Sequence, residues 1–367
     1  MNGNINRGLS PVAIRLAVAL LISLVVATAS ELLWQTKAQA AEVCKSWAGL
    51  TSLQETVDAN MCTEVQPGTY MLSKYLLIAD GRILQGNPAF PRESIVIKAQ
   101  APFNTNGNEG LINGFQPPHT GVATIRHLTL DGNNLSTGAI GAGYMVIEDI
   151  IAQGGRCWGI AVVGPQMSVS KSLIQLNGAD PTCPGAPGAG VYMSTNGTDY
   201  GNYGPDFRNN EIRNNTGPGV DIFNVWNGKF IGNNVHDNTG WAGFSLLGAY
   251  WTVDKNTISH PSNLPGQVLQ AFCNGGPKGS HSSAIILCQG TVAGGVKTAN
   301  NLITNNTLSS YYGILSIGND EANALAVPTK NSYSGNIFPT ATLQCADDYR
   351  RNGPNASTWL GCKPVYF

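Results

Sequence analysis

A six-residue pattern that recurs along the middle of the chain decides the fold. It reads FRNNEI at 207–212, FIGNNV at 230–235, VDKNTI at 253–258 and ITNNTL at 303–308. The first and sixth positions are apolar, and the fourth is asparagine. After each copy comes a polar turn and then an apolar-x-apolar triplet, usually led by glycine. The triplets are 160–162, 191–193, 220–222, 244–246, 285–287 and 314–316.

Less perfect copies precede these four, at 125–130, 146–151 and 169–174. Taken over all seven copies, the fourth positions are Leu128, Asp149, Ser172, Asn210, Asn233, Asn256 and Asn306. They are 21, 23, 38, 23, 23 and 50 residues apart. The basic repeat is therefore close to 22 residues, with two wider steps that indicate insertions.

This period excludes a helical solenoid, because helical repeats show a 3.6-residue pattern and usually exceed 30 residues. It is typical of a coil in which each turn supplies three short strands, each paired in parallel with its equivalent one coil further on. Asn210, Asn233 and Asn256 would then stack in one bend as an asparagine ladder at the ~4.8 Å strand spacing. We assign that column a structural role only.

The order of apolar-x-x-Asn-x-apolar, turn and Gly-apolar-x-apolar resembles the repeat of the pectate-lyase-like superfamily. Residues 51–59 (TSLQETVDA), 65–70 (VQPGTY), 76–78 (LLI) and 83–86 (ILQG) resemble the N-terminal region of that superfamily. Ser52 with Glu55 forms a capping box, so a short amphipathic helix is expected to cover the first coil. The resemblance implies an all-β fold: a right-handed single-stranded parallel β-helix with this capping helix and a C-terminal tail clipped by a disulfide.

The N-terminus has the pattern of a signal peptide. Arg7 and Arg15 precede an uncharged apolar run at 16–27, and a small-x-small site follows at 38–40. We predict a signal peptide at 1–40, with an uncleaved anchor as the alternative. The rest is predicted as an N-terminal cap with the first coils at 41–122, central coils at 123–320 and a C-terminal cap at 321–367.

All eight cysteines follow the predicted cleavage site, which indicates an oxidising, extracytoplasmic compartment, either secreted or periplasmic. Pairing in sequence order is expected, and no spacing fits a zinc site. The cysteines are Cys44, Cys62, Cys157, Cys183, Cys273, Cys288, Cys345 and Cys362.

The charge composition of the chain limits the classes of partner that it can bind. Lys and Arg total 21 against 22 Asp and Glu in the full chain, and without residues 1–40 the balance is slightly more acidic. Such a surface does not attract nucleic acid or, after signal cleavage, an anionic membrane. We expect a monomer whose partner is a polysaccharide.

In the resembled superfamily the outward face of the Gly-led strand usually forms the substrate groove. The resemblance therefore implies a groove floored by the middle residues of the triplets. These are Ala161, Tyr192, Asp221, Ser245, Ile286 and Leu315. Two insertions, at 179–188 and 261–282, would flank the Asp221 and Ser245 coils, and Asp221 is the only carboxylate on the floor.

The candidate catalytic residues are Asp221, Tyr192, His281, Lys278 and Arg156. Lyase or epimerase chemistry on a uronate needs a base for C5–H, a cation beside the carboxylate and an acid for the leaving oxygen. His281 or Lys278, Arg156 and Tyr192 could fill these roles. Asp221 is a possible calcium ligand; no cofactor is otherwise expected, and the metal stays unknown.

Aromatic side chains near the triplets suggest surfaces on which sugar rings stack. The candidates for substrate binding are Trp158, Tyr200, Trp226, Trp241, Tyr250 and Trp251, with Ser245. Two functions stay open. The first is a secreted lyase or epimerase acting on an acidic glycan. The second is a non-catalytic glycan-binding or adhesive β-helix protein of the cell envelope. It stays open because three catalytic patterns are missing from the sequence. They are the paired carboxylates of hydrolases, the clustered aspartates of calcium-dependent pectate lyases and the Asp-Pro-His-Asp signature of mannuronan epimerases.

Overall fold

The computed structural model describes residues 43–104, 110–114, 121–162, 164–183, 188–194, 204–261, 283–288, 298–317, 331–341, 343–347, 357–359 and 364–366. The chain divides into residues 1–43 and a unit from Cys44 to Phe367, to which all the described elements belong. The predicted signal peptide lies outside the described residues. No helix within the described ranges has the length and apolar character needed to cross a membrane.

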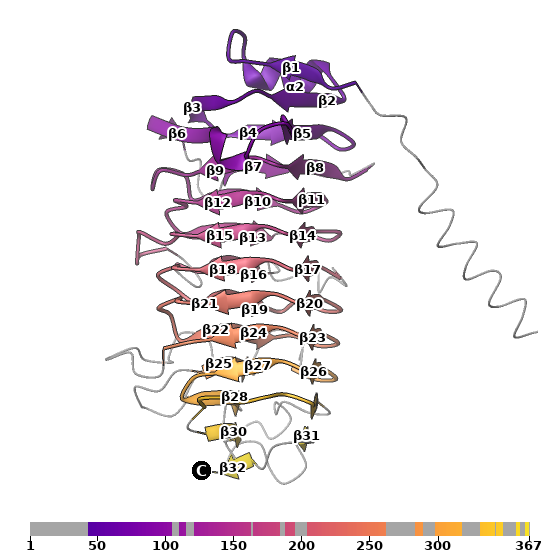
Figure 1. Ribbon diagram of the computed structural model, residues 1–367, viewed down its shortest axis with the longest axis vertical. Coiled ribbons are helices and arrows are strands. Elements are labelled where there is room, and N and C mark those ends of the chain that lie inside the picture. The colour runs from indigo at the N-terminus through magenta and orange to yellow at the C-terminus, as the bar shows by residue number, and fades with distance from the viewer. Residues whose placement is uncertain are drawn as a thin grey trace, which may run out of the picture. The chain divides into compact units, whose positions relative to one another are not determined.

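The described residues of this unit form three parallel sheets that run along a stack of coils (Figure 1). Sheet A contains β1 (Lys45–Trp47), β2 (Cys62–Val65), β5 (Ile83–Gly86), β8 (Ala123–Arg126), β11 (Met145–Glu148), β14 (Ser168–Ser170), β17 (Asp206–Arg208), β20 (Lys229–Ile231), β23 (Thr252–Asp254), β26 (Leu302–Thr304), β29 (Asn331–Ser334) and β31 (Ser357–Trp359). Sheet B contains β3 (Gly68–Lys74), β6 (Ile95–Asn104), β9 (Thr129–Asp131), β12 (Ile151–Gln153), β15 (Leu173–Gln175), β18 (Glu211–Arg213), β21 (Asn234–His236), β24 (Thr257–Ser259) and β27 (Thr307–Ser309). Sheet C contains β4 (Leu76–Ile78), β7 (Gly110–Gly114), β10 (Gly138–Ala142), β13 (Trp158–Val162), β16 (Val191–Ser194), β19 (Val220–Phe223), β22 (Ala242–Leu247), β25 (Ser283–Cys288), β28 (Tyr312–Ile317), β30 (Leu343–Asp347) and β32 (Pro364–Tyr366).

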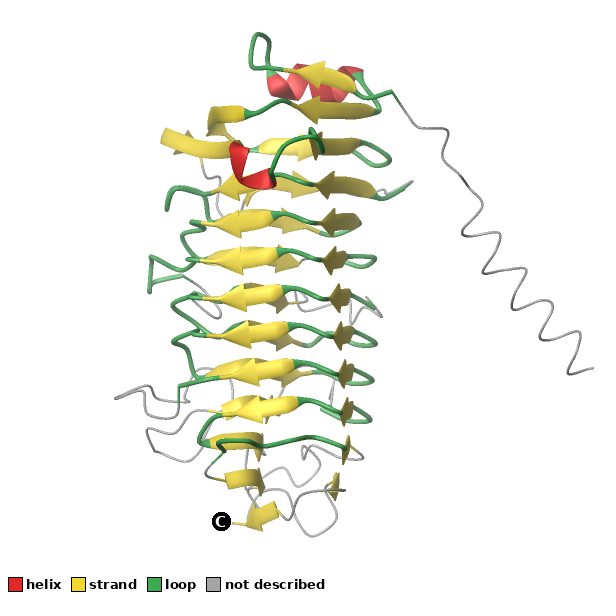
Figure 2. Cartoon of the chain, viewed as in Figure 1, coloured by secondary structure: helices red, strands yellow, loops and turns green. Residues whose placement is uncertain are grey.

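Each coil visits sheets A, B and C in that order, and every strand pairs with its equivalents in the adjacent coils. Almost all of the regular structure is strand (Figure 2); the helical elements among the described residues are α2 (Leu53–Ala59) and the 3₁₀ turn η1 (Arg92–Ser94). Parallel crossovers of this kind are right-handed. The predicted right-handed parallel β-helix is confirmed.

Alternate side chains of each strand point into the coil and form one continuous core. Phe207 and Phe230 lie at paired positions of β17 and β20 and are both fully buried. Phe244 then joins them from sheet C, with its ring centroid 4.8 Å from that of Phe230. A single coil could not bury these rings, so stability depends on stacking many coils.

The predicted asparagine ladder is confirmed in the bend between sheets A and B. Asn210, Asn233, Asn256 and Asn306 are all buried. Each donates its backbone N–H and its Nδ2 to Oδ1 of the next, at 2.8–3.1 Å. The ladder continues one step further, to Asn336.

A second ladder, not predicted from the sequence, occupies the bend between sheets B and C. Asn177 donates to Asn215, and Asn215 donates to Asn238, each through backbone N–H and Nδ2. This ladder explains why glycine leads the triplets, because a Cβ on Gly190 would lie 2.7 Å from Asn215 Nδ2. The spacing in the sequence could have predicted this ladder, because these asparagines follow the fourth positions of their repeats by five residues.

The structure corrects the predicted register of the copy at 146–151 by one residue. β11 pairs with β14 through Ile147 and Val169, so the copy runs from 147 to 152 rather than 146 to 151. Ile150, not Asp149, occupies the ladder position. Its backbone N–H donates to Ser172 Oγ at 3.2 Å. The adjacent isoleucines at 150 and 151 hid the register, and the corrected steps of 22 and 22 are more regular than the predicted 21 and 23.

The predicted capping helix is α2. Ser52 Oγ accepts the Glu55 N–H at the helix start, and Leu53 and Val57 are buried against the core. Two disulfides, Cys44–Cys62 and Cys157–Cys183, follow the expected sequence order. Cys345, in the C-terminal region, is also disulfide-bonded.

Candidate functional site

The predicted floor residues lie in one column on the outward face of sheet C. The register pairs Ala161 with Tyr192, Tyr192 with Asp221, Asp221 with Ser245, Ser245 with Ile286, and Ile286 with Leu315. The spacing of the repeats therefore placed this column correctly. Tyr192 is half-buried, whereas the other five side chains are buried. The expectation of an open floor is wrong for those five.

Ala161, Ile286 and Leu315 are covered by neighbouring side chains, with which they form two clusters outside the main core. The Trp158 cluster consists of Cys157, Trp158, Ala161, Cys183 and Ala189, with Tyr192 and Trp241 packed against it. The Ile286 cluster consists of Ala242, Leu247, Ile286, Tyr312 and Leu315, with Phe223, Trp241 and Tyr311 packed against it. Asp221 and Ser245 belong to neither, so they form a polar step in the column between two apolar clusters.

Asp221 is the central residue of this face. It is 1% exposed, and burial raises the pKa of its carboxyl from 3.8 to about 7, although a hydrogen bond with Ser245 acts in the opposite direction. Within the described structure, its Oδ2 has no hydrogen-bond partner. A carboxyl that titrates near neutral pH can both accept and donate a proton there.

Tyr192 lies one coil before Asp221. Burial raises the pKa of its phenol, a hydrogen bond with Ser194 lowers it, and the charge of Asp221 raises it further. The net pKa is raised, which keeps the phenol protonated at neutral pH. The Trp158 indole stacks on the Tyr192 ring, with centroids 4.9 Å apart and planes 11° from parallel.

The Cys157–Cys183 disulfide and Trp241 complete the surroundings of Tyr192. The disulfide joins the turn before β13 to the first insertion and belongs to the Trp158 cluster. Trp241 packs against both clusters, so it spans the polar step between them. Trp158, predicted as a sugar platform, is 4% exposed and supports the Tyr192 ring instead.

Among the described residues, Arg156 is the one other charged candidate, and it does not lie beside Asp221. Arg156 lies in the turn before β13, two coils from Asp221, with its Nε 3.7 Å from Asp180 Oδ2. Two strand spacings separate it from the Asp221 coil by about 10 Å. His281 and Lys278 lie outside the described residues, and so does Tyr200.

The aromatic candidates divide by location. Trp251 is wrongly predicted as a substrate contact, because it is 1% exposed within the main core and its Nε1 donates to Val225 O at 2.7 Å. Tyr250 beside it is 55% exposed. Trp226 is half-buried, and its Nε1 lacks a partner within the described structure.

One further polar residue of this face, Ser283, was not predicted from the sequence pattern. Ser283 pairs with Ala242 on β22 and is fully buried, and its Oγ has no hydrogen-bond partner within the described structure. It precedes the triplet rather than occupying its middle, so the floor pattern did not include it. The described residues contain no group of three or more His, Cys, Asp or Glu suited to a metal ion.

The chain was compared with protein-family models, curated proteins and solved structures. Neither the protein-family models nor the curated proteins gave a match. The A-module of mannuronan C-5 epimerase AlgE4 from Azotobacter vinelandii superimposes with a TM-score of 0.55 and 13% identity, over 87% of this chain and 94% of that one. The chain shares the parallel β-helix fold with that module.

Two further solved β-helix structures are more distant. Pectate lyase Pel9A has a TM-score of 0.46 and 12% identity, over 89% of this chain and 83% of that one. The alginate lyase of Paenibacillus sp. str. FPU-7 has a TM-score of 0.41 and 15% identity, over 81% and 95% respectively. At these identities the likeness to solved structures concerns the β-helix fold and not the reaction.

Proposed function

We propose that this β-helix protein is exported through a signal peptide at 1–40 and acts on an acidic polysaccharide, as a lyase or epimerase of uronate units. One observation carries the proposal: a buried carboxyl, Asp221, with a pKa of about 7 lies between Tyr192 and Ser245 on the outward face of sheet C. Perturbed acids of this kind concentrate at functional sites.

The two titratable side chains suit proton transfer at C5 of a uronate. Asp221, when ionised, would accept the C5 proton, and the electron pair of the broken C–H bond would move into the carboxylate as an enolate. In a lyase, the C4–O bond would then break, a C4=C5 double bond would form, and the Tyr192 phenol would protonate the leaving oxygen. In an epimerase, a proton would return to C5 from the opposite face.

A glycoside hydrolase fits less well. Hydrolysis uses two carboxyl groups on either side of the scissile bond, and the described outward column holds only Asp221. Asp180, which lies close to Arg156, is in the insertion before β16, one coil before Asp221, and its Oδ1 accepts hydrogen bonds from Thr182. The proposal is therefore elimination or epimerisation rather than hydrolysis.

A second candidate is a non-catalytic glycan-binding or adhesive protein. The burial of Asp221, Ile286 and Leu315 favours it, because a fully covered column gives a polymer no direct access to the carboxyl. Exposed Tyr250 and half-buried Trp226, in turns after sheet C, would then contact the glycan. Such a protein would bind polymer without changing it.

The test uses the full exported protein and a panel of polyuronates. Ultraviolet absorbance of the unsaturated product reports a lyase, proton NMR of the C5 configuration reports an epimerase, and each assay is run with and without EDTA to test calcium. Asp221→Asn should abolish turnover, whereas Asp237→Asn, a change at an exposed turn carboxylate, should not. Polymer retention without turnover would favour the binding protein, and full activity of Asp221→Asn would remove Asp221 from the site.

A further inference from the structure

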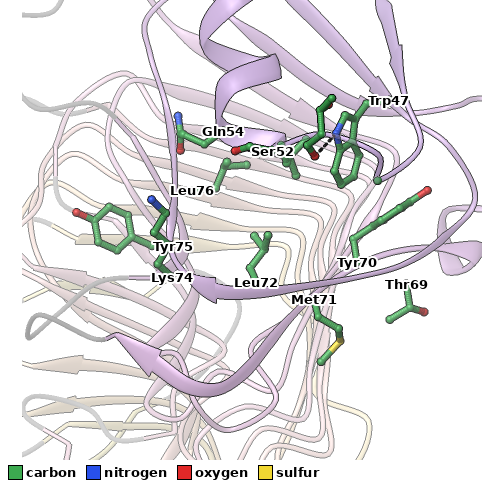
Figure 3. Close-up of a pocket in the computed structure, with 13 residues that line it drawn as sticks. Trp47, Ser52, Gln54, Thr69, Tyr70, Met71, Leu72, Lys74, Tyr75 and Leu76 are labelled. Carbon is green, nitrogen blue, oxygen red and sulfur yellow. Dashed lines mark hydrogen bonds between the residues drawn. The ribbon is translucent and has the colours of Figure 1, made fainter.

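The N-terminal end of the stack contains a pocket of about 330 Å³ (Figure 3). It lies where the first coil lacks a strand. β1 belongs to sheet A, and α2 packs against β4 at the edge of sheet C, but no described strand precedes β3 in sheet B. Residues 48–52 cross this position without pairing to β3, and the gap is the pocket.

The pocket has an apolar middle and two different ends. Leu72 and Leu76 lie between the ends, with Trp47 and Tyr70 to one side of them and Lys74 and Tyr75 to the other (Figure 3). Trp47 and Tyr70 contact each other, with ring centroids 4.6 Å apart. Aromatic and aliphatic walls with a few polar groups at defined places are typical of small-ligand sites.

Most polar groups around the pocket are already used by the fold. Gln54 Oε1 accepts the Leu77 N–H at 2.9 Å, and its Nε2 donates to Leu77 O at 3.0 Å, so this amide closes the open edge of β4. Trp47 Nε1 donates to Thr51 O, and Tyr70 Oη donates to Gln66 O, each at 3.0 Å. These groups hold the pocket's shape and have no spare donor for a ligand.

Three polar side-chain groups of the lining are still available to a ligand: the Lys74 ammonium, the Tyr75 hydroxyl and the Thr69 hydroxyl. None takes part in a hydrogen bond or ion pair within the described structure. β3 also ends sheet B, so its outer edge presents backbone groups that pair with no other described strand. Among the described lining residues, Lys74 is the only charged one.

We infer that this pocket binds one anionic sugar ring, a uronate unit, with its carboxylate on Lys74 and Tyr75. The apolar face of the ring would lie on Leu72, and its hydroxyls would bond the open edge of β3. The choice of a uronate over other ring-sized carboxylates rests on the proposed function. The pocket itself is separate from the Asp221 site, because five strand positions of sheet C from β4 to β19 correspond to about 24 Å.

The test is a titration of the full protein with galacturonate, galactose and acetate, followed by ligand-observed NMR. Galacturonate should bind, and galactose should bind at least about tenfold more weakly because it lacks the charge. Lys74→Met should weaken galacturonate binding by a similar factor, and Tyr75→Phe by less. Lys45→Met, at an exposed lysine on β1 outside the lining, is the matched control and should change nothing.

Separate results distinguish this site from the one at Asp221. Asp221→Asn should keep galacturonate binding at the cap, and Lys74→Met should keep any turnover of polymer. Unchanged binding by Lys74→Met, or equal binding of galactose or acetate, would overturn the inference. So would an absence of binding in the folded wild-type protein, whatever the outcome of the polymer assays.

Discussion

Asn210 donates both its backbone N–H and its side-chain Nδ2 to a single atom, Asn233 Oδ1, at 2.9 Å each. Asn233 repeats the arrangement with Asn256, and its Nδ2 also donates to Phe207 O at 3.1 Å. One buried amide thus satisfies groups in three coils. The ladder fixes the register of successive coils where a repeating core of similar apolar residues would not.

Removing one amide from this ladder should therefore cost more than its own hydrogen bonds. Asn233→Ala leaves the N–H and Nδ2 of Asn210, the carbonyl of Phe207 and the Oδ1 of Asn256 without this partner in a dry interior. Each unsatisfied buried group costs about 1–3 kcal/mol, so we expect a loss of roughly 3 kcal/mol or more in the free energy of unfolding. Urea denaturation measures it.

The adjacent residue supplies the control. Asn234 is exposed on β21, and Asn234→Ala should change the free energy of unfolding by less than about 0.5 kcal/mol. Equal effects of the two variants would show that the ladder amide contributes no more than a surface asparagine.

The pKa of Asp221 gives a pH-dependent prediction. The unfolded carboxyl has a pKa near 3.8 and the folded one about 7, so the folded state binds more protons between these values. The neutral form suits the buried site. Because of the penalty for ionising it, the full stability of the fold is present below about pH 4, falls as pH rises toward about 7 and levels off above that value. A shift of this size corresponds to at most roughly 4 kcal/mol.

Asp221→Asn removes that penalty. In denaturation experiments from pH 4 to 8, the variant should match the wild type in stability near pH 4, exceed it increasingly up to about pH 7 and keep a constant advantage above that pH. Ser245→Ala should raise the pKa of Asp221 further, because the lost hydrogen bond favours the ionised form. A constant difference between Asp221→Asn and the wild type from pH 4 to 8 would contradict a raised pKa.

The sequence predicted much of this molecule because a β-helix is specified by spacing. Once Asn210, Asn233 and Asn256 are stacked, the column through Tyr192, Asp221 and Ser245 follows from chain connectivity. The spacing failed at Asp149, where adjacent isoleucines allowed two registers. It also failed to show that Asp221 is covered, because side-chain packing outside the coil, as in the Trp158 cluster, has no period.

Asp149 makes a different contribution from the one expected. It has a positive φ angle, as do His127 and Lys171 at the equivalent positions of the neighbouring coils. Each of these residues directly precedes the ladder position of its coil. His127 Nδ1 lies 2.6 Å from Asp149 Oδ2, and its Nε2 lies 2.8 Å from Phe90 O. Arg92 donates to Asp149 Oδ1 at 2.9 Å, so the 90–92 segment is tied to this bend.

Both partners of the His127 ring are acceptors, so the protonated imidazole suits the site. Burial lowers the pKa of His127, but the hydrogen bonds to Asp149 and Phe90 O and the charge of Asp149 outweigh it, and the net pKa is raised above 6.5. The stabilisation is therefore present below pH 6.5 and is lost as pH rises through the raised value. His127→Asn keeps a residue that tolerates the left-handed backbone and should remove this pH dependence.

Thermal unfolding of His127→Asn and the wild type at pH 5.5 and 8.5 measures the effect. The wild type should be the more stable at pH 5.5, and the difference should shrink at pH 8.5. His236→Asn is the control, because its ring contacts Glu211 on β18 and Asp237 in the turn after β21 instead. A difference that grows with pH would contradict a protonated His127.

The Cys157–Cys183 disulfide should stabilise the fold and also order the Trp158 cluster. It closes a separation of 26 residues, which the chain-entropy model equates with about 3 kcal/mol. The Cys44–Cys62 disulfide closes 18 residues at the N-terminal end of the described stack and should contribute a similar amount. The two pairs differ in what they touch, because only the first packs with Trp158 and Tyr192.

Double serine variants separate the two contributions. Both pairs should lower the melting temperature, but only Cys157→Ser with Cys183→Ser should reduce the near-ultraviolet circular dichroism of the stacked Trp158 and Tyr192 rings. If Tyr192 supplies a proton in turnover, the same variant should lose activity while Cys44→Ser with Cys62→Ser keeps it. An unchanged aromatic signal in the first variant would show that the stack holds without the disulfide, because the rings and Trp241 pack well enough alone.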